Sequence, residues 1–276
     1  MEQVNFKLDD DGFISHAAND DISQSKGELK WADGDTLAND AKPPTYLIND
    51  ILETDSHGLL VGASMSFKTF VALGIAHSIC TGKPFMGNKV FTKGKVLYIC
   101  GEGKGGISRR LKAIKLIYGG FNDNLFILED TITIDGVIDM ERLKQAVEDK
   151  EPLLVIFDTF SSLSGDTLEN DNGSVAKCLR LVMKSCNGDG ITSSMIVHHH
   201  GKDATSGSRG ASAFIGNTDF LFTMEKDKNQ SMLTKLSCTK QKDDEPYNDI
   251  YMQAEIVQLG LTKQDGTQAS SLVLKP

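Results

Sequence analysis

A loop of small residues between two apolar segments carries the residue types that bind phosphate. The stretch Gly58–Thr69 reads Gly-Leu-Leu-Val-Gly-Ala-Ser-Met-Ser-Phe-Lys-Thr, and an apolar segment over residues 70–79 follows it. Its spacing is that of the P-loop, G-x-x-x-x-G-K-[ST], except that Phe67 stands in place of the second glycine. In such a strand–loop–helix unit, the backbone N–H groups of the loop and the N-terminus of the helix face a polyphosphate.

The side chains of this loop predict a nucleotide site. Lys68 would reach the β- and γ-phosphates, and the hydroxyl of Thr69 would ligate Mg²⁺. Phe67 matters for the loop geometry if its position requires a positive φ, which glycine adopts without steric cost. The alternative is a serine-rich turn before a buried helix, so the rest of the chain has to decide. The expected nucleotide-binding residues are Gly62, Ala63, Ser64, Met65, Ser66, Phe67, Lys68, Thr69 and Phe70.

Two carboxylates follow apolar segments that are typical of buried strands. The run Leu153–Phe157 is followed by Asp158, and Lys95–Cys100 is followed by Gly101 and Glu102. Because parallel strands end at one edge of a sheet, beside the P-loop, Asp158 is predicted to bind Mg²⁺ directly or through water. Glu102 could orient and deprotonate an attacking water. The alternatives are a cap or turn residue for Asp158 and a solvent-facing carboxylate for Glu102.

A second glycine pattern lies in the same region. Gly101-x-Gly103-x-x-Gly106 follows a predicted strand and precedes a predicted helix, which is the context of a dinucleotide-binding turn. We reject this interpretation, because a bare G-x-G-x-x-G is a weak signal and the P-loop with Asp158 already accounts for a nucleotide site.

Polar residues follow another predicted strand, Met195–Val197. Three histidines, His198–His200, come directly after it, and consecutive side chains of an extended chain cannot all face one metal ion. We therefore expect a polar sensor of the γ-phosphate rather than a metal site, with a simple polar strand exit as the alternative. Residues 201–210, which include Arg209, form a small, flexible and basic stretch that suits a loop binding backbone phosphates.

A lysine pair closes a later predicted strand. Lys240 and Lys242 lie on either side of Gln241, just beyond the segment Ser231–Cys238. Lysine at the end of a surface strand is ordinary. These two cations could also reach the γ-phosphate bound by a neighbouring subunit.

The elements around these residues alternate between strand and helix. Apolar residues at helical spacing follow the predicted strands at 95–100, 125–128 and 153–157, whereas no helical pattern separates the strands beyond Thr218. This order indicates an α/β fold with a mainly parallel central sheet flanked by helices, which the late strands extend as an antiparallel edge. The expected late strands are Phe220–Met224, Ser231–Cys238, Ile250–Val257 and Ser270–Leu274.

The composition bounds the class of protein. The 276 residues carry a formal net charge of −9, which argues against a chain-wide basic surface for nucleic acid but not against a local basic site. The five cysteines show no C-x-x-C spacing and mostly lie in apolar runs, so we expect buried free thiols. No targeting segment or membrane span is predicted, and the expected location is the cytoplasm.

Taken in order, these motifs resemble the RecA-like ATPases of the plasmid RepA hexameric helicase group, and more distantly the DnaB-type helicases and RadA. The resemblance runs from about Pro43 to about Pro246. It rests on the P-loop, Ile99-Cys100-Gly101-Glu102, Ser108-Arg109-Arg110-Leu111, Ile156-Phe157-Asp158-Thr159, Val197-His198-His199-His200-Gly201-Lys202, Ser208-Arg209-Gly210-Ala211-Ser212 and Thr239-Lys240-Gln241-Lys242.

The resemblance implies a domain organisation and an activity. Residues 41–276 would form a RecA-like ATPase domain, preceded by a weakly ordered arm or docking segment over residues 1–40. ATP and Mg²⁺ would be bound, and the protein would act on single-stranded DNA as a ring, expected to be a hexamer. A helicase that acts in replication is the leading expectation.

The resemblance also implies roles for single residues. Glu102 would be the catalytic base, and either His199 or His200 would be the sensor. Arg209, Lys240 and Lys242 would be the cations supplied to a neighbour's site. Lys242 stands where the DnaB type has arginine, and a lysine lacks the bidentate fork of arginine.

Two other functions remain open from the sequence. The first is a recombination or repair ATPase that binds DNA without unwinding it. The second is a nucleotide-switched loader or regulator that turns over slowly. A strand-displacement assay distinguishes the repair ATPase from a helicase. The loader or regulator is distinguished by ATP turnover that DNA does not affect.

Overall fold

The computed structural model describes residues 6–8, 14–16, 31–101, 104–165, 167, 171–187, 192–199 and 211–276. The chain divides into two compact units, Met1–Thr45 and Tyr46–Pro276.

The first unit is small. Strands β1 (Phe6–Leu8) and β2 (Ile14–His16) pair in antiparallel fashion. Helix α1 (Gly34–Asn39) begins after Asp33, whose carboxylate accepts the N–H of Thr36 at 2.9 Å, as helix N-caps commonly do. No residue of α1 is buried.

The second unit is built on one large sheet. Among the described residues this sheet has nine strands, and the short pair β3 (Tyr46–Ile48) and β4 (Leu52–Glu53) forms a separate ribbon. In order across the sheet the strands are β13 (Gln268–Lys275), β12 (Ile250–Thr262), β11 (Leu233–Gln241), β10 (Phe220–Lys226), β5 (His57–Gly62), β9 (Ser193–His199), β8 (Leu154–Asp158), β6 (Val96–Cys100) and β7 (Leu125–Leu128).

The predicted α/β architecture is confirmed. Strands β10, β5, β9, β8, β6 and β7 run parallel, and β11, β12 and β13 continue the sheet in antiparallel fashion. One detail differs from the expectation, because β10 belongs to the parallel part and pairs with β5 in register Phe220↔Gly58. The short helix α7 (Ala211–Gly216) precedes β10 and was not predicted. The carboxyl end of β10 therefore lies beside the end of the P-loop strand.

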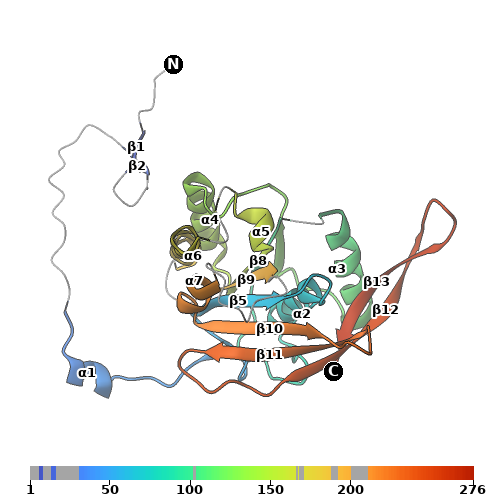
Figure 1. Cartoon of the computed structure of the whole chain (residues 1–276), viewed down its shortest axis with the longest axis horizontal. Coiled ribbons are helices and arrows are strands. Elements are labelled where there is room, and N and C mark those ends of the chain that lie inside the picture. The colour runs from blue at the N-terminus through green and yellow to red at the C-terminus, as the bar shows by residue number, and fades with distance from the viewer. Residues whose placement is uncertain are drawn as a thin grey trace. The chain divides into compact units, whose positions relative to one another are not determined.

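The helices form two groups. Helix α2 (Lys68–Thr81) packs against α3 (Lys104–Tyr118), whereas α6 (Asn172–Cys186) contacts both α4 (Val137–Lys150) and α7. Figure 1 shows α4, α6 and α7 together, away from α3. The short helix α5 (Phe160–Leu163) follows β8 directly.

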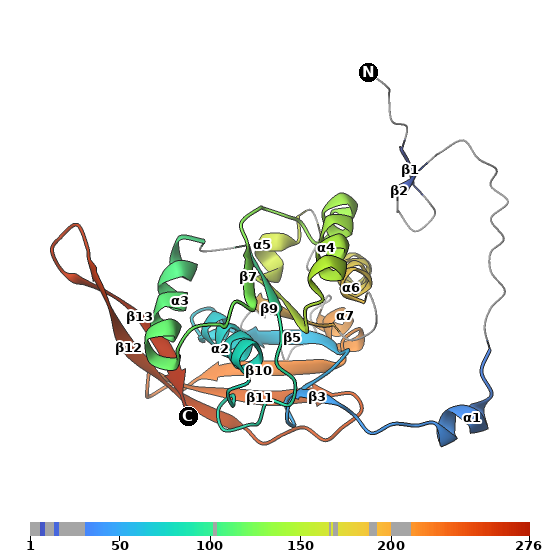
Figure 2. The same cartoon turned by 180° about the vertical axis from the view of Figure 1, so that it is seen from behind.

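Helix α2 is buried along most of its length. Ten of its side chains are buried, including residues on all sides of the helix, because the sheet, α3 and β13 surround it. A helix that is apolar all round belongs in the interior of a domain. It ends at Gly82, whose φ of +77° suits glycine at a helix C-terminus. In Figure 2 the helix is seen from behind, against the strands.

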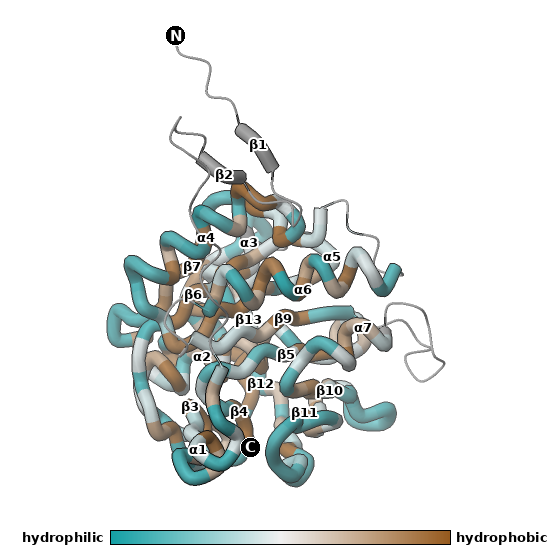
Figure 3. Tube along the Cα trace, turned by 90° about the vertical axis from the view of Figure 1, so that its left-hand side faces the viewer, coloured by the Kyte–Doolittle hydropathy of each residue, from teal (hydrophilic) through white to brown (hydrophobic). Residues whose placement is uncertain are grey.

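The last two strands form a long hairpin. Figure 1 shows β12 and β13 extending beyond the rest of the sheet. Near its base the hairpin packs against α3, and the Tyr118 hydroxyl donates a hydrogen bond to the carbonyl of Leu274 at 2.6 Å. Tyr251 and Ile256 on β12 are more than half exposed. Figure 3 shows how hydrophobic and hydrophilic residues alternate along the elements of this unit.

Two composition-based expectations can be compared with this structure. All five cysteines are free thiols and four of them are buried, as predicted, and burial raises the pKa of the Cys80, Cys178 and Cys186 thiols to about 12. Within the part of the chain that the structure describes, no helix has the length and hydrophobicity that crossing a bilayer requires.

Candidate functional site

The P-loop connects β5 to α2 as predicted. Gly62 ends the strand in close contact with the neighbouring strand, because a Cβ added there would lie 2.6 Å from the carbonyl oxygen of Met224. Only glycine fits at this position. The loop therefore passes close to the end of β10, and Thr234 on β11 donates a hydrogen bond from its hydroxyl to the carbonyl of Ser66 at 3.4 Å.

Phe67 adopts the conformation of the glycine that it replaces. Its φ is +69° and its ψ is 17°, in the left-handed region, and the residue immediately precedes the first turn of α2. A non-glycine residue held there stores strain on the order of 1–3 kcal/mol. The substitution therefore leaves the path of the loop intact, and the question raised by the sequence is answered in favour of a P-loop geometry.

Lys68 is the best-anchored cation of the loop. Its side chain is buried, and its Nζ donates to the carbonyls of Gly62 at 2.9 Å and Ala63 at 2.8 Å. The Nζ also lies 3.0 Å from Nδ1 of His199 at the end of β9. The ammonium group is thus held at the mouth of the loop by acceptors that a phosphate oxygen could replace.

Asp158 ends β8 and is held by a tyrosine. The Tyr98 hydroxyl on β6 donates to Oδ2 of Asp158 at 2.6 Å, and both side chains are buried. Burial, reinforced by the nearby Asp158 carboxylate, raises the pKa of Tyr98 well above its ordinary value. Tyr98 is therefore a permanent donor that fixes the carboxylate at the sheet edge beside the P-loop.

A cavity of about 410 Å³ joins these groups. It is lined by Ser64, Met65, Ser66, Phe67, Lys68, Thr69, Phe70, Arg110, Asp158, Thr159, His199 and Lys226. The structure thus brings together seven of the nine predicted nucleotide-binding residues, both predicted metal ligands and one predicted sensor. Gly62 and Ala63 bind Lys68 through their carbonyls at the base of the same loop.

Two residues of the site, Lys226 and Tyr98, were not predicted from the sequence, and Arg110 was named only within a motif, without a role. Arg110 lies on α3 with its guanidinium 5.3 Å from the centroid of the Phe70 ring. Lys226 ends β10, and its Nζ lies 5.2 Å from the centroid of the Phe67 ring. No motif marks Lys226. Only the placement of β10 beside β5 brings Lys226 to the site.

The histidines at the end of β9 diverge. His199 faces Lys68, whereas the ring of His198 stacks on Phe214 at a centroid distance of 4.5 Å and meets Phe160 edge to face. Opposite directions are expected for successive side chains of a strand. Of the two sensor candidates His199 reaches the cavity, and His200 lies outside the described residues.

Other predicted site residues are not near this cavity or cannot be placed. Glu102 and Arg209, like His200, fall outside the ranges that the structure describes. Lys240 donates to the carbonyls of Ile215 at 2.7 Å and of Thr218, and Lys242 pairs with Asp219 at 3.3 Å. Because β11 runs antiparallel to β10, both lysines lie at the opposite end of the strands from the P-loop.

The donor chemistry of the cavity fits Mg²⁺. The hydroxyl of Thr69 and the carboxylate of Asp158 both line it, and oxygen ligands are those that Mg²⁺ prefers. No group of three or more His, Cys, Asp or Glu side chains with metal-site geometry occurs among the described residues. Mg²⁺ in nucleotide sites characteristically takes its remaining ligands from phosphates and water.

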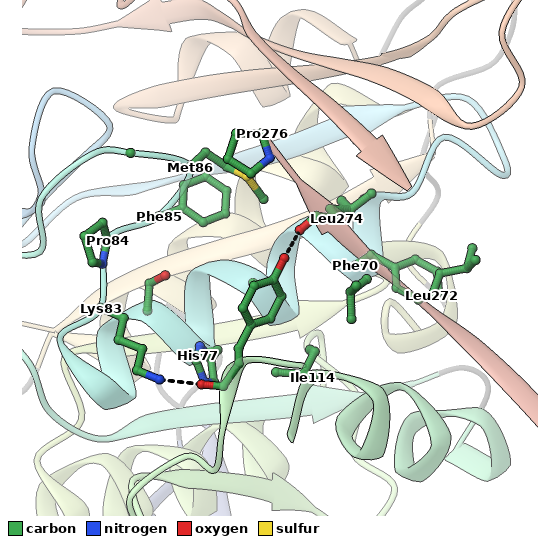
Figure 4. A pocket seen from close by; sticks show the side chains of 15 residues that line it. Phe70, His77, Lys83, Pro84, Phe85, Met86, Ile114, Leu272, Leu274 and Pro276 are labelled. Atoms are coloured by element: carbon green, nitrogen blue, oxygen red, sulfur yellow. Dashed lines mark hydrogen bonds between the residues drawn. The ribbon is translucent and has the colours of Figure 1, made fainter. Parts of the chain in front are cut away.

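A second cavity lies on the flank of α2 and contains none of the predicted catalytic residues. Its volume is about 190 Å³, and it lies between α2, the turn at residues 83–87, α3 and β13. Figure 4 shows apolar side chains of its lining, among them Phe85, Met86 and Leu272. Tyr118 also lines it, donates from its hydroxyl to the carbonyl of Leu274, and accepts at its own carbonyl from Nζ of Lys83. Phe70 belongs to the walls of both cavities.

Comparisons with known proteins show what the chain is similar to. DNA repair protein RadA of Halalkalibacterium halodurans is 28% identical over 120 residues, which are 42% of this chain and 24% of RadA, so the chain spans about a quarter of that relative. The crystal structure of the RadB recombinase superposes with a TM-score of 0.52 at 12% identity, over 72% of this chain and 87% of RadB, which supports a RecA-like fold. A family model described as an AAA domain matches residues 24–205, more than half of the chain and including the P-loop, Asp158 and His199, and the protein belongs to this AAA domain family.

Proposed function

We propose that this protein is a Mg²⁺-dependent ATPase that works on single-stranded DNA. The observation that carries the ATPase assignment is the convergence of Lys68, Asp158 and His199 on one cavity at the carboxyl ends of β5, β8 and β9. Such a crevice at the carboxyl ends of parallel strands is where α/β proteins bind their ligands.

The residues divide the work of phosphoryl transfer. Lys68 exchanges its loop carbonyls for phosphate oxygens, and in doing so stabilises the negative charge that develops at the γ-phosphate. Thr69 and Asp158 would hold Mg²⁺, which would neutralise part of the charge of the phosphates. His199 is placed to sense the γ-phosphate through its contact with Lys68. Glu102, two residues beyond β6, is the proposed base that takes the proton of the attacking water.

The DNA assignment rests on the similarity to a relative named DNA repair protein RadA. This similarity favours an ATPase of recombination or repair over a replicative helicase. A helicase, as the order of the motifs also suggests, is the second candidate, and both would assemble into rings or filaments. A nucleotide-switched loader is the third.

The decisive measurement is ATP hydrolysis by the full chain with and without single-stranded DNA. We expect hydrolysis to require Mg²⁺ and to rise when single-stranded DNA is added. A strand-displacement assay on a forked duplex then separates the first two candidates. Hydrolysis that DNA leaves unchanged would favour the loader, and no detectable nucleotide binding would overturn the ATPase assignment itself.

A further inference from the structure

Two aromatic rings of the P-loop segment each carry a cation. Lys226 lies over Phe67 and Arg110 lies over Phe70, and the two rings meet edge to face with their centroids 6.1 Å apart. All four residues line the cavity that holds Lys68 and Asp158. The two rings are therefore neighbours in the lining of this cavity, and each has a cation close to its face.

Phe67 is an unusual residue for its place. Its φ of +69° is one that glycine adopts freely and phenylalanine adopts only with strain. Its ring is partly buried and packs against the core cluster. The ring also contacts Phe70 and the ammonium group of Lys226, and these contacts add to the core packing that offsets the strain.

Lys226 is not neutralised by the acids next to it in sequence. Glu225 pairs with Lys235 at 3.3 Å, and Asp227 accepts the N–H groups of Asn229 and Gln230 at 2.8 Å each. Within the described parts of the chain, Lys226 forms no ion pair with a carboxylate. Its charge is thus available to an anion in the cavity.

We propose that Lys226 binds the polyphosphate of the nucleotide in cis, and that Phe67 is the positioning residue that holds its ammonium group in place. The ring restricts a flexible side chain, because a cation over an aromatic face is attracted by the ring quadrupole. The replacement of the second glycine of the P-loop is then functional. This proposal deepens the ATPase assignment and rests on it.

The test starts from the substitution that restores the consensus P-loop. In Phe67→Gly the backbone conformation becomes unstrained, yet we expect the affinity for a non-hydrolysable ATP analogue with Mg²⁺ to fall about tenfold, because the ammonium group of Lys226 is no longer held at the phosphates. A tenfold loss corresponds to about 1.4 kcal/mol. Lys226→Ala should lose affinity to a similar degree. The double variant should lose no more than either single variant, because both changes remove one interaction.

Matched variants distinguish the effect of the aromatic face of Phe67 from that of its volume, and the effect of Lys226 from that of a lysine outside the cavity. Phe67→Leu keeps the strain and much of the volume but has no aromatic face, so it should behave like Phe67→Gly, whereas Phe67→Tyr should retain affinity. Lys228→Ala removes a lysine two residues further along, which does not line the cavity, and should leave affinity unchanged. Thermal unfolding of each variant shows that it is folded.

The outcomes are distinguishable from a failure of the ATPase assignment. Analogue binding by Phe67→Gly or Phe67→Leu that is as tight as in the unmodified protein would overturn the positioning role. Additive losses in the double variant would show that Lys226 binds phosphate without the ring. If the unmodified protein does not bind the analogue at all, the proposed function fails before this question arises.

Discussion

The two cavities beside α2 share one wall at Phe70 but are built by opposite means. The P-loop cavity is formed by strand ends and a loop, and it gathers charged groups such as Lys68, Asp158 and Arg110. The flank cavity is formed by the side of a helix and a hairpin, and two hydrogen bonds join its own walls, from Tyr118 to the carbonyl of Leu274 and from Lys83 to the carbonyl of Tyr118. The P-loop cavity presents charged groups to a ligand, whereas the flank cavity belongs to the packing that holds α2 in place.

The largest effect is expected for a substitution in the P-loop cavity, on the rate of ATP hydrolysis. Lys68→Ala should lower ATP hydrolysis at least a thousandfold, because the loss of a cation at the γ-phosphate removes several kcal/mol of transition-state stabilisation. Steady-state hydrolysis measures it, with circular dichroism as the control for folding. Hydrolysis that survives unchanged would place the nucleotide elsewhere.

The second largest effect is expected from a change at Asp158, the proposed Mg²⁺ ligand. Asp158→Asn keeps an oxygen that accepts the Tyr98 hydroxyl but removes the negative charge, so we expect hydrolysis to fall at least about a hundredfold and the Mg²⁺ requirement to shift to higher concentration. Tyr98→Phe is the matched comparison, since it removes the donor and leaves the charge. An Asp158→Asn protein with an unaltered Mg²⁺ titration would contradict the metal role.

A substitution in the wall of the flank cavity should lower the stability of the fold without changing the rate of ATP hydrolysis. Ile114 is buried in its wall, and Ile114→Ala should destabilise the fold by about 2–4 kcal/mol through lost burial and an enlarged void. Denaturant unfolding gives this value. At temperatures where the variant is folded, its rate of ATP hydrolysis should match that of the unmodified protein, and a selective loss of hydrolysis would mean that the two cavities are coupled.

The smallest effect expected is a pH dependence at His77, which lines the flank cavity on α2. Burial, helped by the charge of Lys83, lowers the pKa of His77. A lowered pKa in the folded state means that its stabilising contribution is full above the unfolded pKa of about 6.5 and is lost as the pH falls through the folded value. His77→Phe should therefore be less sensitive to acid than the unmodified protein, as measured by unfolding between about pH 7 and pH 5. If the free energies of unfolding of the variant and the unmodified protein change equally with pH over that range, His77 makes no such contribution.

The parts of the molecule that follow from local pattern were predicted well. The strand at Leu125–Leu128 was predicted with its observed bounds, and Asp158 was expected at a strand end beside the P-loop, where the structure has it. Both depend on short apolar runs that stand out in sequence. The run of β8 is buried throughout, as central strands of a parallel sheet are, whereas β7 lies at the edge of the sheet and is half-buried.

The site residues that could not be predicted depend on which elements become neighbours in the fold. β10 has the composition of any late strand, and nothing in its residues tells that it pairs with β5 in parallel. Lys226 could not be assigned to the site for that reason. Arg110 could not be given a role before α3 was known to bring its guanidinium to the Phe70 ring, and Tyr98 could not be matched to Asp158 before β6 and β8 were known to be adjacent. The left-handed φ of Phe67 was posed as a question by the missing glycine, and only the backbone could answer it.

The separation of Lys240 from the P-loop has a consequence for symmetry. Lys240 lies six positions beyond Thr234, the residue of β11 that pairs with Lys226, which corresponds to about 20 Å along the strand. If lysines at this end of the sheet complete a site on another copy, the two contacting surfaces are different patches. Such a contact is heterologous, so it closes into a ring or continues as a helical filament, and an isolated two-fold dimer cannot satisfy it.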